Sequence, residues 1–307
     1  MARMFFNPSS FYFLFIVSLI SLPSVGLAQL KVITTTPDLA ALSRNVGGNL
    51  VEVTSIVRGD QDPHYLEPKP SYVVLLNRAD LLIEVGLDLE SGWLPVLLVQ
   101  SRNPKIQRGE KGHLTAAAGV PILEVPTGKI DRSMGDVHPE GNPHYWMNPR
   151  NGLIIAKTIA DRLSELDPTN AAIYAENFKR WESSFSKQIA EWEREMVPLR
   201  GKTLITHHKS FSYFVDWAGL RVVGLIEPKP GIPPTPSHIL SLIDLIQKER
   251  IPLIIAENYY DPKPARELSE KTGAKFLILP TAVGGDLETK SYEDLFEFLV
   301  KKFKEAL

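Results

Sequence analysis

The sequence contains no cysteine. Disulfide bridges, thiolate-bound metals, iron–sulfur clusters and cysteine nucleophiles are therefore excluded together, and any metal must be held by nitrogen and oxygen ligands. Excess charge is also missing, because 34 Lys and Arg nearly balance 36 Asp and Glu and leave a net charge of −2. The protein thus lacks the basic surface that nucleic-acid binding requires.

What the sequence does contain is enough apolar material for a large core. Of its 307 residues, 44% are hydrophobic and 23% are charged, a composition typical of one large globular domain or two of ordinary size. Its 24 prolines and 20 glycines are scattered between apolar runs and indicate turns, not a linker. Intrinsic disorder is therefore not expected.

Residues 1–28 have the layout of a secretory signal peptide. Arg3 is their one charge, residues 11–22 are almost entirely apolar, and small residues at 26 and 28 precede Gln29 as in a cleavage site. The apolar run is shorter than the ~20 residues of a spanning helix, although an uncleaved membrane anchor remains the alternative. Because no cysteine is available for lipidation, we predict a periplasmic protein without a lipid anchor.

Strand-like and helical patterns alternate along the mature chain, which predicts an α/β fold with mainly parallel sheets. A longer helix is predicted over residues 170–197, where apolar residues recur every three or four positions. At 1.5 Å per residue it spans about 42 Å, long enough to join two halves of the protein. Strands are predicted over 31–35, 51–56 and 80–85, and shorter helices over 38–46, 71–77 and 153–166.

The two halves resemble each other. Residues 202–206 repeat the pattern of residues 31–35, and Pro-x-Pro-Ser at 234–237 repeats that at 68–71, with offsets of 171 and 166 residues. This order predicts two similar lobes, and a ligand is expected between them at the carboxyl ends of strands. The predicted organisation is a signal peptide over 1–28, an N-terminal lobe over 29–167, a linking helix over 168–198 and a C-terminal lobe over 199–307.

Three of the seven histidines stand in loops beside aromatic residues: His64, His144 and His208. His64 and His144 share the tripeptide Pro-His-Tyr, in which proline stiffens the backbone and the aromatic ring limits access of water. Three neutral imidazoles that meet at one point suit Zn²⁺ or another borderline divalent ion. This duplicated context favours a metal site over three unrelated histidines.

The motifs around these histidines are specific. They read Asp-Pro-His-x-x-Glu-Pro at 62–68, Pro-His-x-Trp-x-Asn-Pro at 143–149 and His-x-x-Phe-x-Tyr-Phe at 208–214, so the histidines are 80 and 64 residues apart. Over residues 30–307 the chain resembles the zinc/manganese-type solute-binding proteins of bacterial metal ABC transporters, the cluster A-I family.

That resemblance implies two lobes joined by one long rigid helix, with one metal ion between them. His64 and His144 would be ligands from the first lobe and His208 from the second, whereas His207 matches no ligand position. It also implies a monomer that captures a divalent metal and delivers it to a membrane permease for import. Because three imidazoles make the ligand set rich in nitrogen, zinc is expected before manganese.

The fourth ligand position departs from the family. Many members carry Asp where this chain has Thr281, and a neutral threonine is a poor ligand for Zn²⁺ or Mn²⁺. Water, Thr281, Asp286 and Glu257 therefore remain open as the fourth ligand. His138, in a short remnant of the histidine-rich loop of some zinc members, is predicted to face solvent.

A secreted zinc hydrolase is the alternative function, since three histidines and one water also form a catalytic zinc site. Such an enzyme needs a general base beside the water. The sequence has no His-Glu-x-x-His helix, and none of the three motifs offers a carboxylate placed like its glutamate. We therefore predict a binding protein and not an enzyme.

Overall fold

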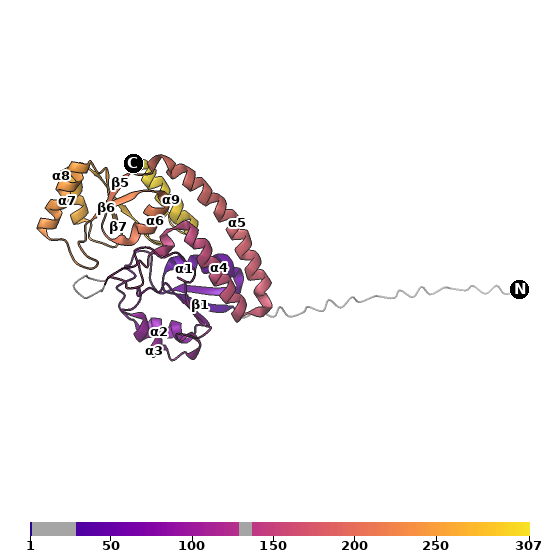
Figure 1. Cartoon of the computed structure of the whole chain (residues 1–307). Helices are drawn as coiled ribbons and strands as arrows, with labels where there is room; N and C mark the ends of the chain where they lie inside the picture. The colour runs from indigo at the N-terminus through magenta and orange to yellow at the C-terminus, as the bar shows by residue number, and fades with distance from the viewer. Residues whose placement is uncertain (2–28, 129–136) are drawn as a thin grey trace.

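The computed structural model describes residue 1 and residues 29–128 and 137–307, so the predicted signal peptide lies outside the described residues apart from Met1. Two lobes lie next to each other, and helix α5 (Ala171–Met196) curves along one side of both (Figure 1). Among the described residues, no helix has the length and hydrophobicity needed to cross a membrane. The predicted α/β fold with two parallel-sheet lobes and a linking helix is confirmed.

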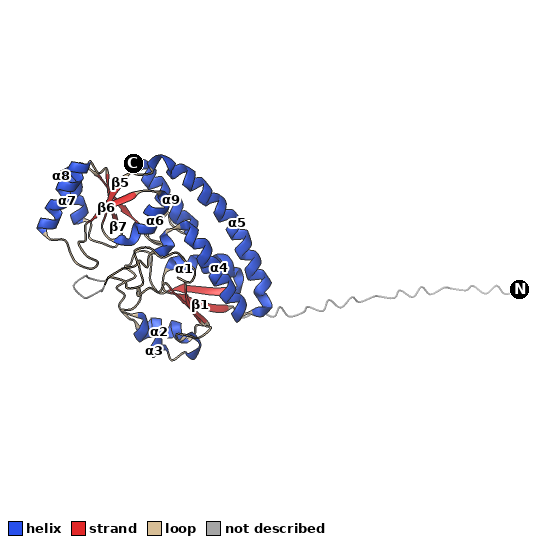
Figure 2. Ribbon diagram, in the orientation of Figure 1, coloured by secondary structure: helices blue, strands red, loops and turns tan. Residues whose placement is uncertain are grey.

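The N-terminal lobe is built on one parallel sheet of order β2-β1-β3-β4. In Figure 2, α2 and α3 cover one face of this sheet and α1 and α4 cover the other. Helix α4 starts where the sequence signals it, because the Asn148 side chain accepts a hydrogen bond from the Arg150 backbone N–H at 2.9 Å. The elements are β1 (Leu30–Thr34), α1 (Pro37–Gly47), β2 (Val51–Ser55), α2 (Pro70–Asn77), β3 (Leu81–Glu84), α3 (Leu94–Ser101), β4 (His113–Thr115) and α4 (Pro149–Leu166).

The C-terminal lobe repeats this architecture. Its parallel sheet has the order β6-β5-β7-β8, which is the order of the first sheet with each strand replaced by its counterpart. The internal repeat seen in the sequence is therefore a repeat of topology. The elements are β5 (Thr203–Thr206), α6 (Ser212–Ala218), β6 (Arg221–Leu225), α7 (Pro236–Glu249), β7 (Leu253–Glu257), α8 (Lys263–Thr272), β8 (Lys275–Leu279) and α9 (Tyr292–Ala306).

Helix α5 connects the lobes as the apolar stripe predicts. Its 26 residues span about 39 Å at 1.5 Å per residue. It contacts α1 and α4 of the first lobe and α9 of the second, so one rigid element packs on both. Short 3₁₀ turns at Pro168–Asn170 and Val197–Leu199 flank it. The buried stripe consists of Tyr174, Phe178, Phe185, Ile189, Trp192 and Met196.

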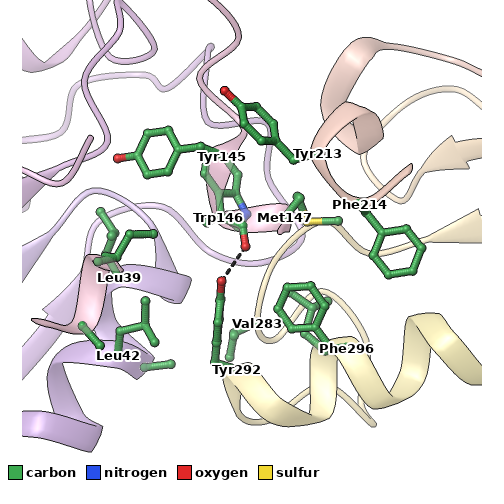
Figure 3. Packing of buried hydrophobic residues seen from close by; sticks show 14 of the residues in the cluster. Leu39, Leu42, Tyr145, Trp146, Met147, Tyr213, Phe214, Val283, Tyr292 and Phe296 are labelled. Atoms are coloured by element: carbon green, nitrogen blue, oxygen red, sulfur yellow. Dashed lines mark hydrogen bonds between the residues drawn. The ribbon is translucent and has the colours of Figure 1, made fainter. Parts of the chain in front are cut away.

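One hydrophobic core runs through both lobes instead of stopping at their boundary. Figure 3 shows Trp146 and Tyr292 where the lobes meet, with the Tyr292 hydroxyl donating to the Trp146 carbonyl. The Trp146 indole N–H in turn donates to the Thr281 carbonyl of the second lobe at 2.8 Å. Two smaller cores lie beneath the outer helices, α2 with α3 and α7 with α8. The continuous core opposes large hinge motion between the lobes.

Loops at the strand ends also join the lobes directly. The buried Asp38 carboxylate at the start of α1 accepts a hydrogen bond from the Val283 N–H at 3.0 Å. Gly59 approaches the same loop so closely that a Cβ atom there would lie 2.3 Å from the Val283 carbonyl oxygen. The loop after β8 is therefore held against the loop that leads to His64.

Candidate metal centre

The structure brings His64, His144 and His208 together at the lobe boundary. His64 lies in the loop between β2 and α2, His144 lies before α4, and His208 lies two residues after the end of β5. One ring nitrogen from each residue lies within 4.8 Å of the others. The ring centroids are 5.1, 5.4 and 5.5 Å apart. Imidazoles around a tetrahedral ion at a Zn–N distance of about 2.1 Å have centroids about 5 Å apart, so the observed spacing fits such an ion.

These imidazoles are removed from water. His144 is 1% exposed and His208 is 6% exposed. Among the described residues, nothing forms a hydrogen bond with His64 Nε2 or with either ring nitrogen of His144. A buried polar atom without a partner destabilises a folded protein unless a ligand or water satisfies it. The open nitrogens are thus the donor set expected of a metal site.

Two of the three imidazoles have a carboxylate behind them. Asp62 Oδ1 lies 2.7 Å from His64 Nδ1, and Glu227 Oε2 lies 2.7 Å from His208 Nδ1. A carboxylate beside Nδ1 keeps the proton on Nδ1, so the lone pair resides on Nε2 and points away from the carboxylate. Both rings are therefore oriented for metal binding through Nε2.

The carboxylates also set the charge at the centre. Burial alone would raise the pKa of Asp62, but the hydrogen bonds with His64 and the charges of His64 and His208 together outweigh burial, and the pKa is lowered. Burial alone would lower the pKa of His208, but the hydrogen bond with Glu227 and the charges of Glu257 and Asp62 raise it. Asp62 is thus an anion at neutral pH, and His208 binds a proton more readily than an ordinary histidine.

His144 is held differently. Asn142 Oδ1 accepts the backbone N–H of His144 at 2.9 Å, and Asn142 Nδ2 donates to the Lys209 carbonyl at 3.0 Å. One side chain thus joins the loop that carries His144 to the residue that follows His208. Burial and then the neighbouring imidazoles hold the pKa of His144 well below its usual value, so this ring is neutral at pH 7.

Thr281, Asp286 and Glu257 were the side chains considered for the fourth ligand. None of them belongs to the converging group, which among the described residues consists of the three histidines. Thr281 is buried, and its hydroxyl donates to Tyr259 at 3.4 Å. Asp286 is exposed, and its Oδ1 accepts the Glu288 N–H at 2.9 Å. Glu257 is 1% exposed, and burial raises its pKa to about 7.

His138 is half-buried and does not face solvent as fully as predicted. Its ring centroid lies 5.3 Å from that of His64, and its Nε2 is buried with no hydrogen-bond partner in the part of the chain that is described. It lines a cavity of about 90 Å³ with His144 and His208. The sequence around a single histidine in an acidic loop does not indicate whether the side chain is buried. Its burial depends on where the loop lies in the folded protein.

The other histidines have structural partners. His207 stacks on Tyr260, with ring centroids 4.4 Å apart and planes 8° apart. His113 Nε2 lies 3.0 Å from the buried carboxylate of Glu84. His238 Nε2 lies 2.9 Å from the Leu225 carbonyl oxygen.

Residues 32–306 match the family described as zinc-uptake complex component A, periplasmic. The chain belongs to this family. It is 30% identical over 288 residues to the manganese ABC transporter substrate-binding lipoprotein PsaA of Streptococcus pneumoniae, covering 91% of this chain and 89% of that protein. It is 28% identical over 291 residues to the metal ABC transporter substrate-binding lipoprotein ScbA of Streptococcus cristatus, covering 92% and 90%.

Solved structures share the fold of this chain. A crystal structure of ZnuA superposes with a TM-score of 0.75 at 24% identity, covering 91% of this chain and 99% of that one. A Mn-bound periplasmic metal binding protein from Candidatus Liberibacter asiaticus superposes with a TM-score of 0.74 at 23% identity, covering 90% and 99%.

Membership in this family defines the class of function. The protein is an extracytoplasmic substrate-binding component of a metal ABC transporter, which binds a divalent metal ion and works with a membrane permease. Family members are transport proteins and not enzymes, so the alternative of a secreted zinc hydrolase has no support.

Proposed function

We propose that the protein captures one Zn²⁺ ion through His64, His144 and His208 and delivers it to the permease of an ABC transporter for import. The observation that carries this proposal is the convergence of three imidazoles, each of which has one ring nitrogen within 4.8 Å of the others. Metal binding would satisfy nitrogen atoms that are otherwise buried without a partner in the described structure.

The choice of Zn²⁺ over Mn²⁺ rests on the chemistry of the donors. All the converging atoms within the described residues are nitrogens, and Asp62 and Glu227 stand behind the rings. Imidazole nitrogen suits Zn²⁺, whereas Mn²⁺ prefers carboxylate, carbonyl and water oxygen. Mn²⁺ is the alternative cargo, because several relatives are named as manganese transport proteins.

Metal analysis of protein purified without added metal, followed by calorimetric titration, tests the proposal. We expect about one equivalent of zinc, much tighter binding of Zn²⁺ than of Mn²⁺, and loss of tight binding in His144→Ala. His238→Ala is the matched control, since His238 hydrogen-bonds Leu225 outside the centre. Unchanged Zn²⁺ affinity in His144→Ala would refute the ligand set, and tighter binding of Mn²⁺ would refute the choice of cargo.

We also propose that residues 1–28 are a cleaved signal peptide and that the mature protein is a periplasmic monomer without lipid. This rests on the layout of the segment and on the absence of cysteine, although the relatives named above are lipoproteins. N-terminal sequencing of exported protein should begin at about Gln29, and sedimentation should give the mass of one chain. Retention of Met1, or membrane association that survives a salt wash, would contradict the proposal.

A further inference from the structure

His138 lies beside the three converging histidines. The ring centroids of His138 and His64 are 5.3 Å apart, within the range of 5.1 to 5.5 Å found in the group of three, and the two planes are tilted by 36°. His138 also lines one cavity of about 90 Å³ together with His144 and His208. The ring therefore lies beside all three members of the centre.

The hydrogen bonds of His138 prepare one nitrogen for a metal. Its ring bonds to the backbone of Leu87. Nε2 is buried and makes no hydrogen bond with any described residue, so Nδ1 makes this bond and donates its proton to the carbonyl. The lone pair then resides on Nε2, as in a metal-binding histidine whose other nitrogen donates to a carbonyl.

We propose that His138 Nε2 is the fourth ligand of the ion, which gives a site of four imidazoles. This inference rests on the proposed function of His64, His144 and His208. The converging atoms within 4.8 Å come from three residues, so the His138 ring must turn inward to join them. The cavity of about 90 Å³ that it lines with His144 and His208 leaves room for this movement and for the ion.

Glu257 is the main competitor for this position. Its two carboxylate oxygens are buried and make no hydrogen bond with a described residue. However, Glu257 is not among the residues that line the cavity shared by His138, His144 and His208. Its carboxylate therefore does not face the space in which His138 lies.

Charge balance also favours a neutral fourth ligand. Asp62 and Glu227 already hydrogen-bond two of the rings and together carry the charge that neutralises a divalent cation. A third buried carboxylate would leave excess negative charge in a water-poor site, which is unfavourable. A fourth imidazole completes the tetrahedron without adding charge.

X-ray absorption at the zinc edge tests this assignment, because it counts zinc-bound imidazoles. We expect four in the parent protein and three plus an oxygen in His138→Ala. Removal of a mere hydrogen-bond partner of a zinc-bound histidine weakens binding by about 10- to 100-fold, so loss of a ligand should weaken Zn²⁺ binding at least about tenfold. His238→Ala should keep both the parent affinity and the parent spectrum, and melting of each variant without metal checks that it is folded.

The outcomes separate this inference from the function on which it rests. If His144→Ala loses tight binding while His138→Ala keeps the parent affinity and spectrum, His138 is not a ligand and the three-histidine proposal stands. If Glu257→Gln then loses an oxygen ligand, Glu257 holds the fourth position. If neither His144→Ala nor His138→Ala changes binding, the metal site itself is wrongly placed.

Discussion

Replacing Glu227 with glutamine removes a charge from behind a proposed ligand and leaves the shape of the side chain unchanged. The Glu227 Oε2 to His208 Nδ1 distance is 2.7 Å, and the side chains are 6% and 7% exposed, so water screens this pair weakly. Loss of a carboxylate partner of this kind lowers metal affinity by about 10- to 100-fold. This corresponds to about 1.4 to 2.8 kcal/mol of binding free energy.

The same substitution should change the pH dependence of binding. Glu227 helps to raise the pKa of His208, and a protonated His208 cannot bind a metal. In the parent protein, affinity is therefore lost as the pH falls through this raised pKa. In Glu227→Gln the pKa of His208 is lower, so protons begin to compete at a lower pH. The affinity difference should be largest at alkaline pH and should narrow as the solution becomes acidic.

Zn²⁺ titration of both proteins between pH 5.5 and 8.5 measures these effects. Glu124→Gln is the matched control, because Glu124 also lines the cavity but pairs with Lys209 at 2.9 Å and not with a histidine. It should shift affinity little and keep the parent pH profile. Equal affinity of Glu227→Gln and parent at pH 8, or a difference that is the same at every pH, would refute the reasoning.

Three further experiments test the contacts that join the two lobes around the metal centre. Small-angle scattering should give nearly the same radius of gyration with and without Zn²⁺, because α5 and a continuous core join the lobes, whereas marked compaction would contradict this. Burial raises the pKa of Asp38 to about 7, so its ionisation lowers stability as the pH rises from about 4 through 7. In urea denaturation Asp38→Asn should therefore be the more stable protein above pH 7, by on the order of 4 kcal/mol, and an equal advantage at pH 4 would exclude this cause. Gly59→Ala should lower the free energy of unfolding by about 1 to 3 kcal/mol and weaken Zn²⁺ binding, because its Cβ would clash with the backbone of the loop after β8. Stability equal to that of the parent would show that this loop can move to accommodate the methyl group.

Features that depend on local pattern were predictable from the sequence. The apolar stripe of α5 is a property of its own residues, and its predicted bounds of 170–197 differ from Ala171–Met196 by one residue at each end. Likewise, the proposed ligands could be selected because His64 and His144 share a tripeptide. His64 and His208 follow parallel strands of different sheets, and ligands are expected at the carboxyl ends of such strands, whereas His144 lies before α4.

Features that depend on long-range contacts were not predictable from local pattern. Glu227 lies 19 residues after His208, yet the pairing of β5 with β6 brings it to the histidine, with the Glu227 N–H bonded to the His207 carbonyl at 3.1 Å. The predicted parallel sheet could have indicated that His208 and Glu227 lie close together, since both residues follow neighbouring parallel strands. His138 offers no such signal. The short strand β4, of three residues, was also missed because periodicity needs a longer run.

The repeated topology explains why the centre needs both lobes. The segment after β5 carries His208, and the segment after its counterpart β1 leads to Asp38, which accepts a hydrogen bond from Val283 of the opposite lobe. Likewise, the loop after β2 carries His64, and the loop after its counterpart β6 carries Glu227, which hydrogen-bonds His208. The loops that follow corresponding strands of the two lobes thus have different functions. Neither lobe alone contains the three converging imidazoles, and the core that joins the lobes holds them in place. Capture and release of the ion should therefore depend on movement of the loops that carry His64, His138 and His144, because a large separation of the lobes would break that core.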